Sequence, residues 1–429
     1  MVIRDRPTTQ PTEPTPQPTD ATEPTNEPQR PTDPIEVPSV NYAQVIYASP
    51  NGTGSGKTAN DSTDVRTAIN DIAEGGIIYL LEGTYTSDKV LTIPHDKDGS
   101  AGKLKTMAAY PGATVKFDFS SQPYELENGK AAGSNQRGIS LDADYWHLYG
   151  FEVYGAADNG IYVTGSNNIV EMVVLDGNRD TGLQISRRSS DLTDMKDWPS
   201  NNLIKNCTAY NNCDDATMEN ADGFAAKLTC GEGNVFDGCI AYNNSDDGWD
   251  LYAKEATGPI GVVTIRNCIA FRNGFTTDGR GYGDCDGNGF KLGGGGIGTR
   301  HVIENCLAFE NLNCGFTDNN NPEFGVMKNC TGYNNNLGGN GKANYMVYRC
   351  STTATFDNMM SYYSVGNVTK TNAAGIKAGN DKFVGVMNNG VFYNSKYYNA
   401  TNNVTMTNGI KLNDNIVTQA DSDFVTLSV

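Results

Sequence analysis

The sequence contains no apolar run as long as a membrane-spanning helix needs, and its 32 lysines and arginines are outnumbered by 50 aspartates and glutamates. The formal net charge of −18 leaves no basic excess to neutralise nucleic-acid phosphates. We therefore expect neither a membrane nor a nucleic acid as a partner. The first five residues also lack the charged and apolar regions of a signal peptide, so either export is not encoded here or a leader has been removed.

Residues 1–41 contain almost no apolar side chains. The stretch from Pro7 to Pro34 repeats proline and threonine, a composition that cannot bury a core. It predicts a disordered, semi-extended linker of the kind that separates modules in extracellular enzymes. The alternative is a disordered tail with no further role. We expect a secreted protein in which this linker joins another module to a folded domain at residues 42–429.

Helical patterning is nearly absent from this domain. Apolar Val65, Ala68, Ile69 and Ile72 have helical spacing between Asp64 and Ala73, and the pair Gly75–Gly76 ends the pattern. After Val90 the chain consists of short β-rich runs separated by Gly, Asn and Asp. One short N-terminal helix followed only by strands is typical of a cap on a stack of sheets.

Two short sequence patterns recur along the chain with one period. The first has a glycine before an apolar residue, at Gly160, Gly182, Gly223, Gly248, Gly289 and Gly315. These glycines are about 22–26 residues apart, except where the two loops beginning at Arg187 and Gly274 lengthen the step. The second reads NCTAYNN at Asn206 and returns, with small changes, at Gly238, Asn267, Asn305 and Asn329. The Leu-x-x-Leu-x-Leu frame of leucine-rich repeats is missing. The pattern predicts an all-β, right-handed parallel β-helix with asparagine ladders between coils.

Five of the ten cysteines occupy the same place in the second pattern: Cys207, Cys239, Cys268, Cys306 and Cys330. We expect them to stack inside the coils as small apolar groups. Disulfide bonds remain an alternative. A zinc site is disfavoured because the sequence has no paired Cys-x-x-Cys spacing.

Strand geometry converts the first pattern into columns of side chains. Successive side chains of a strand point to opposite faces, and equivalent residues of neighbouring coils lie about 4.8 Å apart. If the aromatic residue after each glycine points inward, one outward column reads Ala225, Asp250, Lys291 and Thr317. The residue before each glycine contributes Asp222 and Asp247, and Asp246 is at the same corner. Four carboxylates and one lysine therefore meet on one outer face.

A concentration of hard oxygen donors is suited to Ca²⁺, which takes 6 to 8 oxygen ligands. Each residue alone has an ordinary explanation. Asp before Gly is common in turns, and a pair between Lys291 and Asp250 is an unremarkable surface contact. The four carboxylates together with the lysine favour a calcium site.

With these columns, the stretch from about Asn206 to Asn319 resembles the polysaccharide lyase family 9 pectate lyases, and the Gly83 segment GTYT resembles the start of many β-helix lyases. The resemblance implies a calcium-dependent lyase that acts as a monomer on acidic pectic polysaccharide. It implies Asp222, Asp246, Asp247 and Asp250 as calcium ligands and Lys291 as the catalytic base. Candidates for binding the substrate are Lys227, Tyr252, Arg272 and Arg280, each of which also has an ordinary surface role.

The residues suit β-elimination, in which a base removes the C5 proton of a uronide while the C4 oxygen leaves. A nearby dication lowers the pKa of a lysine, whereas the local carboxylates raise it. Three alternatives stay open: a rhamnogalacturonan lyase, a polygalacturonase-type hydrolase and a non-catalytic carbohydrate-binding β-helix. The hydrolase is disfavoured because this sequence lacks the Gly-His-Gly and Arg-Ile-Lys motifs that polygalacturonases usually have.

Overall fold

The computed structural model describes residues 41–127, 130–132, 136–281, 284–339, 342, 344–347, 349–350, 354–357, 360–362, 404–405 and 411–412. The predicted linker lies outside this part except for Asn41, and so does most of the predicted domain after Tyr362. Within the described part, no helix is both long enough and apolar enough to pass through a membrane.

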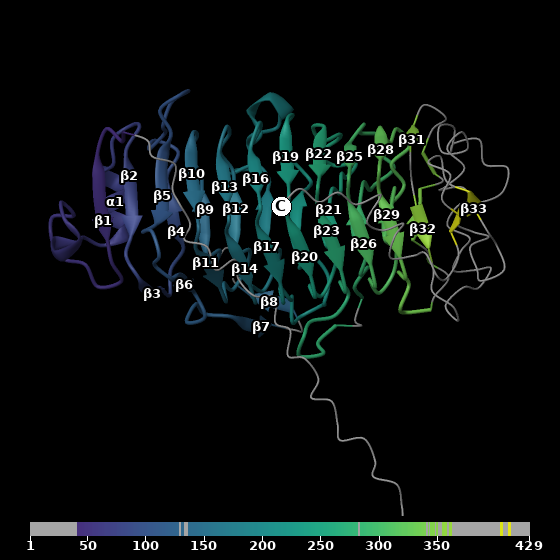
Figure 1. The fold of residues 1–429 in the computed structure, drawn as a ribbon, viewed down its shortest axis with the longest axis horizontal. Coiled ribbons are helices and arrows are strands. Elements are labelled where there is room, and N and C mark those ends of the chain that lie inside the picture. Colours follow the sequence, from purple (N-terminus) through teal and green to yellow (C-terminus); the bar gives the residue numbers. More distant parts are fainter. Residues whose placement is uncertain are drawn as a thin grey trace, which may run out of the picture. The chain divides into compact units, whose positions relative to one another are not determined.

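Three parallel sheets form a stack of coils (Figure 1). The first sheet has 11 strands: β1 (Val45–Ala48), β2 (Ile77–Leu80), β5 (Lys105–Ala109), β10 (Trp146–Tyr149), β13 (Ile169–Glu171), β16 (Leu203–Lys205), β19 (Asn234–Asp237), β22 (Val263–Arg266), β25 (Val302–Glu304), β28 (Val326–Lys328) and β31 (Thr355–Asp357). The second sheet has 10: β3 (Gly83–Thr86), β6 (Val115–Asp118), β11 (Glu152–Tyr154), β14 (Val174–Asp176), β17 (Thr208–Tyr210), β20 (Ile240–Tyr242), β23 (Ile269–Phe271), β26 (Leu307–Phe309), β29 (Thr331–Tyr333) and β32 (Met360–Tyr362). The third sheet has nine: β4 (Leu91–Ile93), β9 (Ile139–Leu141), β12 (Ile161–Val163), β15 (Leu183–Ile185), β18 (Phe224–Ala226), β21 (Trp249–Asp250), β24 (Phe290–Lys291), β27 (Phe316–Thr317) and β30 (Tyr345–Met346).

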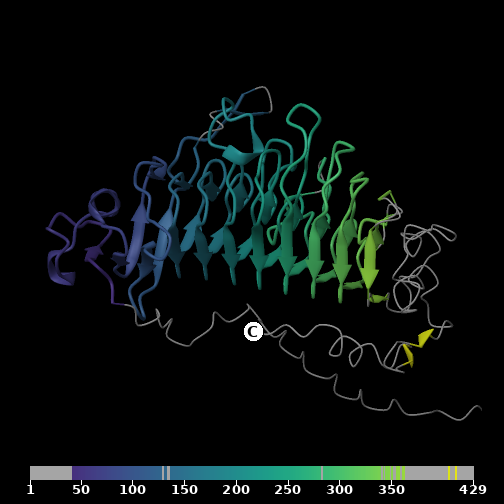
Figure 2. The same cartoon turned by 90° about the horizontal axis from the view of Figure 1, so that it is seen from above.

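Each coil passes through the three sheets in turn, and strands of neighbouring coils pair in parallel and in step. His147 pairs with Ile169 in the first sheet, and Tyr162 pairs with Gln184 in the third. Figure 2 shows the strands of successive coils following one another along the stack. The predicted all-β parallel β-helix is confirmed.

Outside the three sheets the elements are short. They are the helix α1 (Val65–Asp71), the 3₁₀ turns η1 (Ala59–Asp61) and η2 (Met195–Asp197), and the antiparallel pairs β7 (Glu125–Glu127) with β8 (Lys130–Ala132) and β33 (Val404–Thr405) with β34 (Lys411–Leu412). The Asp64 carboxylate caps α1 by accepting from the backbone N–H groups of Arg66 and Thr67. Ala68 and Ile69 are buried, and α1 contacts β1 and β2. The predicted capping helix is confirmed.

The interior contains the predicted stacks. On the third sheet the rings of Phe224, Trp249, Phe290, Phe316 and Tyr345 follow one another with centroids 4.8 to 5.0 Å apart. The five cysteines of the second pattern are buried, and no disulfide joins them. Between the second and third sheets, side-chain amides of successive coils donate to one another over 2.8 to 3.0 Å. This asparagine ladder comprises Asn178, Asn212, Asn244, Asn273, Asn311 and Asn335, and Asn335 donates in turn to Asn344 of its own coil over 2.8 Å.

The repeated glycines are required by close approach. A Cβ on Gly248 would lie 2.5 Å from the carbonyl oxygen of Gly289 and 2.9 Å from the Asn273 amide nitrogen. The corner that opens the second pattern has a different requirement, because Asn206 and Gly238 adopt φ values of 50° and 70°. Asparagine and glycine tolerate this left-handed conformation better than other residues. Both repeated patterns therefore have a steric cause.

Candidate functional site

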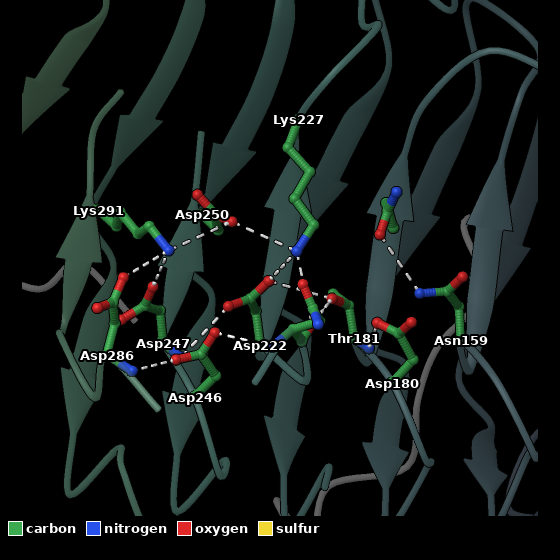
Figure 3. A network of polar contacts seen from close by, with 12 residues as sticks. Asn159, Asp180, Thr181, Asp222, Lys227, Asp246, Asp247, Asp250, Asp286 and Lys291 are labelled. Carbon is green, nitrogen blue, oxygen red and sulfur yellow. Dashed lines mark hydrogen bonds and ion pairs between the residues drawn. The ribbon is translucent and has the colours of Figure 1, made fainter. Parts of the chain in front are cut away.

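The predicted outward column lies on the outer face of the third sheet. Ala225 of β18 pairs with Asp250 of β21, which pairs with Lys291 of β24. The neighbouring aromatic residues Trp249 and Phe290 are fully buried on the inner side. Asp250 and Lys291 therefore project from adjacent coils into one place (Figure 3).

Three of the four predicted ligands meet there. Carboxylate oxygens of Asp222, Asp247 and Asp250 all lie within 4.8 Å of one another. Asp222 and Asp247 are fully buried, and Asp250 is 4% exposed. Because Gly223 and Gly248 allow their coils to approach closely, the aspartates before them are brought onto neighbouring levels of the same corner. We call Asp222, Asp247 and Asp250 the carboxylate cluster.

Two lysines flank the carboxylate cluster from different coils. The Lys227 ammonium lies 2.6 Å from Asp222 Oδ2 and 3.3 Å from Asp250 Oδ2. The Lys291 ammonium lies 3.2 Å from Asp247 Oδ2 and 3.8 Å from Asp250 Oδ2. Charges of opposite sign therefore alternate in a buried place, where unpaired charges are very costly.

Hydrogen bonds fix the orientation of the carboxylates and leave specific oxygens without a donor. Asp222 Oδ1 accepts from the backbone N–H of Asp247, and Asp247 Oδ1 accepts from both the backbone and the side-chain amide of Asn288. Asp247 Oδ2 and Asp250 Oδ1 are buried and accept no well-aligned hydrogen bond, and Asp247 Oδ2 has only the ion pair with Lys291 at 3.2 Å. The cluster therefore presents acceptor capacity that a cation can use.

Asp246 is oriented differently from the other three. Its two oxygens accept from the backbone N–H groups of Asn220, at 2.9 Å, and Asp286, at 2.6 Å. It does not belong to the group whose oxygens lie within 4.8 Å of one another. In the structure it ties two loops to the edge of the carboxylate cluster.

The pKa values of the aspartates and lysines at this site differ strongly from their usual ranges. Burial raises the pKa of Asp222 to about 8 against the opposing charge of Lys227, and burial also holds the pKa of Asp247 well above its usual range. Burial by itself would lower the pKa of Lys291, but the charges of Asp250 and the neighbouring carboxylates overcome it and raise that pKa. The pKa of Lys227 is raised for the same reason. Strongly perturbed groups gathered in one place are typical of functional sites.

The predicted substrate contacts fall in two places. Lys227 flanks the carboxylate cluster, and Tyr252 is near it, since the Lys291 ammonium lies 5.9 Å from the centre of the Tyr252 ring. Arg272 instead pairs with Glu310 at 2.9 Å, and Arg280 pairs with Asp215 at 2.7 Å. The structure shows no contact of either arginine with the carboxylate cluster.

Sequence reasoning missed two residues of the site. Asp286, from the long loop after Gly274, places Oδ2 2.8 Å from the Lys291 ammonium, and its own side chain is half exposed. Asn288 donates twice to Asp247. Asn288 stands in the column before the repeated glycines and was identifiable from it, whereas Asp286 lies in an insertion without a repeat partner.

Comparisons with known proteins agree with this architecture. Residues 46–348 match the family described as Pel9A-like, right-handed beta helix region, which also agrees with the predicted handedness. Over 358 residues the chain is 41% identical to pectate lyase L of Paenibacillus polymyxa, covering 80% of this chain and 77% of that protein. It is also 41% identical to pectate lyase L of Thermoclostridium stercorarium, covering 79% of this chain but only 26% of that longer protein.

A solved structure shares the fold at similar coverage. The crystal structure of pectate lyase Pel9A superimposes with a TM-score of 0.64 and 29% sequence identity, covering 81% of this chain and 88% of that one. The matched part of the chain contains all three members of the carboxylate cluster and both flanking lysines.

Proposed function

The chain belongs to the Pel9A-like, polysaccharide lyase family 9 pectate lyases, and from this premise we propose that it is a calcium-dependent lyase of 4-linked galacturonan with Lys291 as its base. The observation that carries the proposal is the carboxylate cluster beside the Lys291 ammonium on one outer face of the β-helix. A proposed metal-binding group and a proposed base are thus adjacent, an arrangement that suits β-elimination from a uronide.

The residues fit a calcium ion by their chemistry. The donors are carboxylate oxygens, which are the ligands that Ca²⁺ prefers, and Asp247 Oδ2 and Asp250 Oδ1 accept no well-aligned hydrogen bond. Asp222, Asp247 and Asp250 would hold the ion, and we retain Asp246 as a fourth ligand at the edge. When bound, calcium withdraws charge from the substrate carboxylate and stabilises the negative charge that develops as C5 loses its proton.

Lys291 performs the proton transfer in this proposal. The neutral amine accepts the C5 proton, the electron pair of the C5–H bond forms the C4–C5 double bond, and the C4–O bond breaks. The leaving oxygen then acquires a proton from solvent. Apart from Asp286, the carboxylates that raise the pKa of Lys291 are proposed ligands, so a bound cation would offset most of the charges that keep this lysine protonated.

The surrounding residues position these groups. Asn288 orients Asp247 through two hydrogen bonds, and Asp286 holds the Lys291 ammonium from the solvent side. Lys227 compensates Asp222 and Asp250, so we propose that it acts at the edge of the substrate site next to Tyr252. Arg272 and Arg280 remain proposed contacts for more distant parts of the polysaccharide.

The proposed partner is an acidic pectic polysaccharide, as the names of the relatives suggest. We also propose that the protein is a secreted monomer joined to another module through residues 1–41. Because polygalacturonate is polyanionic and the chain carries a net charge of −18, binding depends on local positive groups on the site face.

The test uses polygalacturonate with and without added calcium. Elimination leaves a C4–C5 double bond conjugated with the carboxylate, so ultraviolet absorbance should rise only when calcium is present. New reducing ends without absorbance would instead indicate a hydrolase. If absorbance rises with rhamnogalacturonan but not with polygalacturonate, the protein is a rhamnogalacturonan lyase. If no pectic substrate gives absorbance or reducing ends, a non-catalytic binding module is favoured.

A further inference from the structure

The outward column that carries Asp250 and Lys291 continues toward the N-terminal coils. Asp250 pairs with Ala225, which pairs with Gln184, which in turn pairs with Tyr162. Three coil steps separate Tyr162 from Asp250, or about 14 Å at the usual spacing between strands. Between these two positions the column contains Gln184, which accepts a hydrogen bond from Asn159 over 3.4 Å (Figure 3), and the buried Ala225.

Arg137, just before β9, stacks on Tyr162 of this column. Its guanidinium carbon is 3.4 Å from the centre of the Tyr162 ring, so the planar group is held by stacking. Its Nε is buried and has no hydrogen-bond partner. The nearest carboxylate oxygen, Asp158 Oδ2, is 3.8 Å from Nε, which is too far for a hydrogen bond. Stacking thus fixes the guanidinium, and its N–H donors make no hydrogen bond to any residue that the structure describes.

We propose that Arg137 binds the carboxylate of a second uronate residue of the same polysaccharide chain. A sugar residue is about as long as the separation between coils, so a chain that runs along the stack places this carboxylate about three residues from the carboxylate cluster. Arginine binds carboxylates with two parallel hydrogen bonds. The Arg137 side chain is 23% exposed, and because its Nε is buried, the terminal Nη groups are the ones that would meet the carboxylate. This inference rests on the proposed function and names one distal subsite of it.

A purely structural role for Arg137 has a different signature. As the counter-ion of Asp158, its removal would leave a buried acid uncompensated and would lower stability for every substrate alike. The additional change Asp158→Asn would then restore whatever Arg137→Ala had lost. A uronate-binding role predicts that this restoration does not occur.

The experiment measures binding without turnover, by titration calorimetry in a Lys291→Ala background. One ligand is digalacturonate, and the other is an oligogalacturonate long enough to reach from the carboxylate cluster to Tyr162. Arg137→Ala should weaken binding of the long ligand by about 10- to 100-fold, the usual effect of losing a charged hydrogen bond, and leave digalacturonate unchanged. Arg137→Lys should recover only part of the loss, because an ammonium lacks the planar fork.

Controls separate the possible failures. Arg266→Ala removes an arginine that pairs with Asp237 on the first sheet, and it should leave both ligands unaffected. If Arg137→Ala weakens binding of both ligands equally, or if adding Asp158→Asn restores the affinity, Arg137 is structural. Unchanged affinity for the long ligand in Arg137→Ala would also overturn the inference. If the Lys291→Ala protein with Arg137 intact binds neither uronate, the proposed function itself is wrong and the inference falls with it.

Discussion

Replacing Lys291 by alanine should separate the base from the metal site. General base catalysis contributes about 10²–10⁴-fold, so turnover on polygalacturonate at saturating calcium should fall by at least that range. Calcium affinity, in contrast, should not fall. The ammonium lies 3.2 and 3.8 Å from Asp247 and Asp250, two of the proposed ligands, so its positive charge opposes a cation that they hold. Two unit positive charges about 4 Å apart repel by about 4 kcal/mol at an effective dielectric constant of about 20, and a divalent ion doubles that figure. The variant should therefore bind calcium at least as tightly as the unmodified protein.

The assay pairs initial rates of absorbance increase with calorimetric titration of calcium. Lys291→Arg should be equally inactive, because a guanidinium stays protonated at any workable pH. Lys205→Ala is the matched control, since this lysine pairs with Glu171 at 2.9 Å on the first sheet and should leave both measurements unchanged. Near-normal turnover of Lys291→Ala at saturating calcium would refute the assignment, and Lys227 would be tested next.

Three further predictions concern the metal, the packing and the pH dependence. Asp247→Asn keeps the side-chain volume but removes a proposed ligand charge, so calcium affinity and activity should fall together by at least about 10-fold; unchanged affinity would exclude Asp247. Gly248→Ala should lower the free energy of unfolding by about 1–3 kcal/mol because its Cβ overlaps the next coil. Gly102→Ala meets no atom within 4 Å, so its loss measures the cost of a φ of 78° alone, roughly 1–2 kcal/mol. An unchanged free energy of unfolding for Gly248→Ala would contradict the packing argument. Burial, aided by the charge of Glu152, raises the pKa of Asp176 to about 6, so the folded protein loses stability as pH rises from about 4 through about 6. Asp176→Asn should add at most about 3 kcal/mol to the free energy of unfolding near pH 7, and so raise the melting temperature there, but have no effect near pH 3. An unchanged pH profile would contradict this reasoning.

The sequence predicts the outward column correctly because strand geometry is regular. Side chains alternate with a period of two, and parallel coils pair in step, so equal offsets from a glycine become neighbours in space. Asp250 and Lys291 pair as expected. Trp249 is core and the cysteines form a buried stack, because the same periodicity governs the inner face.

The remaining parts of the site depend on loops that have no period. Asp286 lies in the insertion after Gly274, and no offset predicts that its carboxylate returns to Lys291. Lys227 lies four residues after Gly223, so the same alternation predicts its place beside the calcium corner, whereas its ion pairs with Asp222 and Asp250 do not follow from the pattern. The orientation of Asp246 depends on backbone N–H groups of Asn220 and Asp286, which the sequence pattern does not place.

The in-step pairing of coils has a consequence for how the molecule folds. Each strand of the three sheets pairs only with the coil before and the coil after it, so the array is close to one-dimensional and its order can spread from any nucleus along the stack. The site takes Asp222 from the β18 coil, Asp247 and Asp250 from the β21 coil and Lys291 from the β24 coil. The site is therefore complete only after these three consecutive coils have formed. When the site is occupied by a ligand, backbone amides in β21 should exchange their hydrogens no faster than those in β18 and β24.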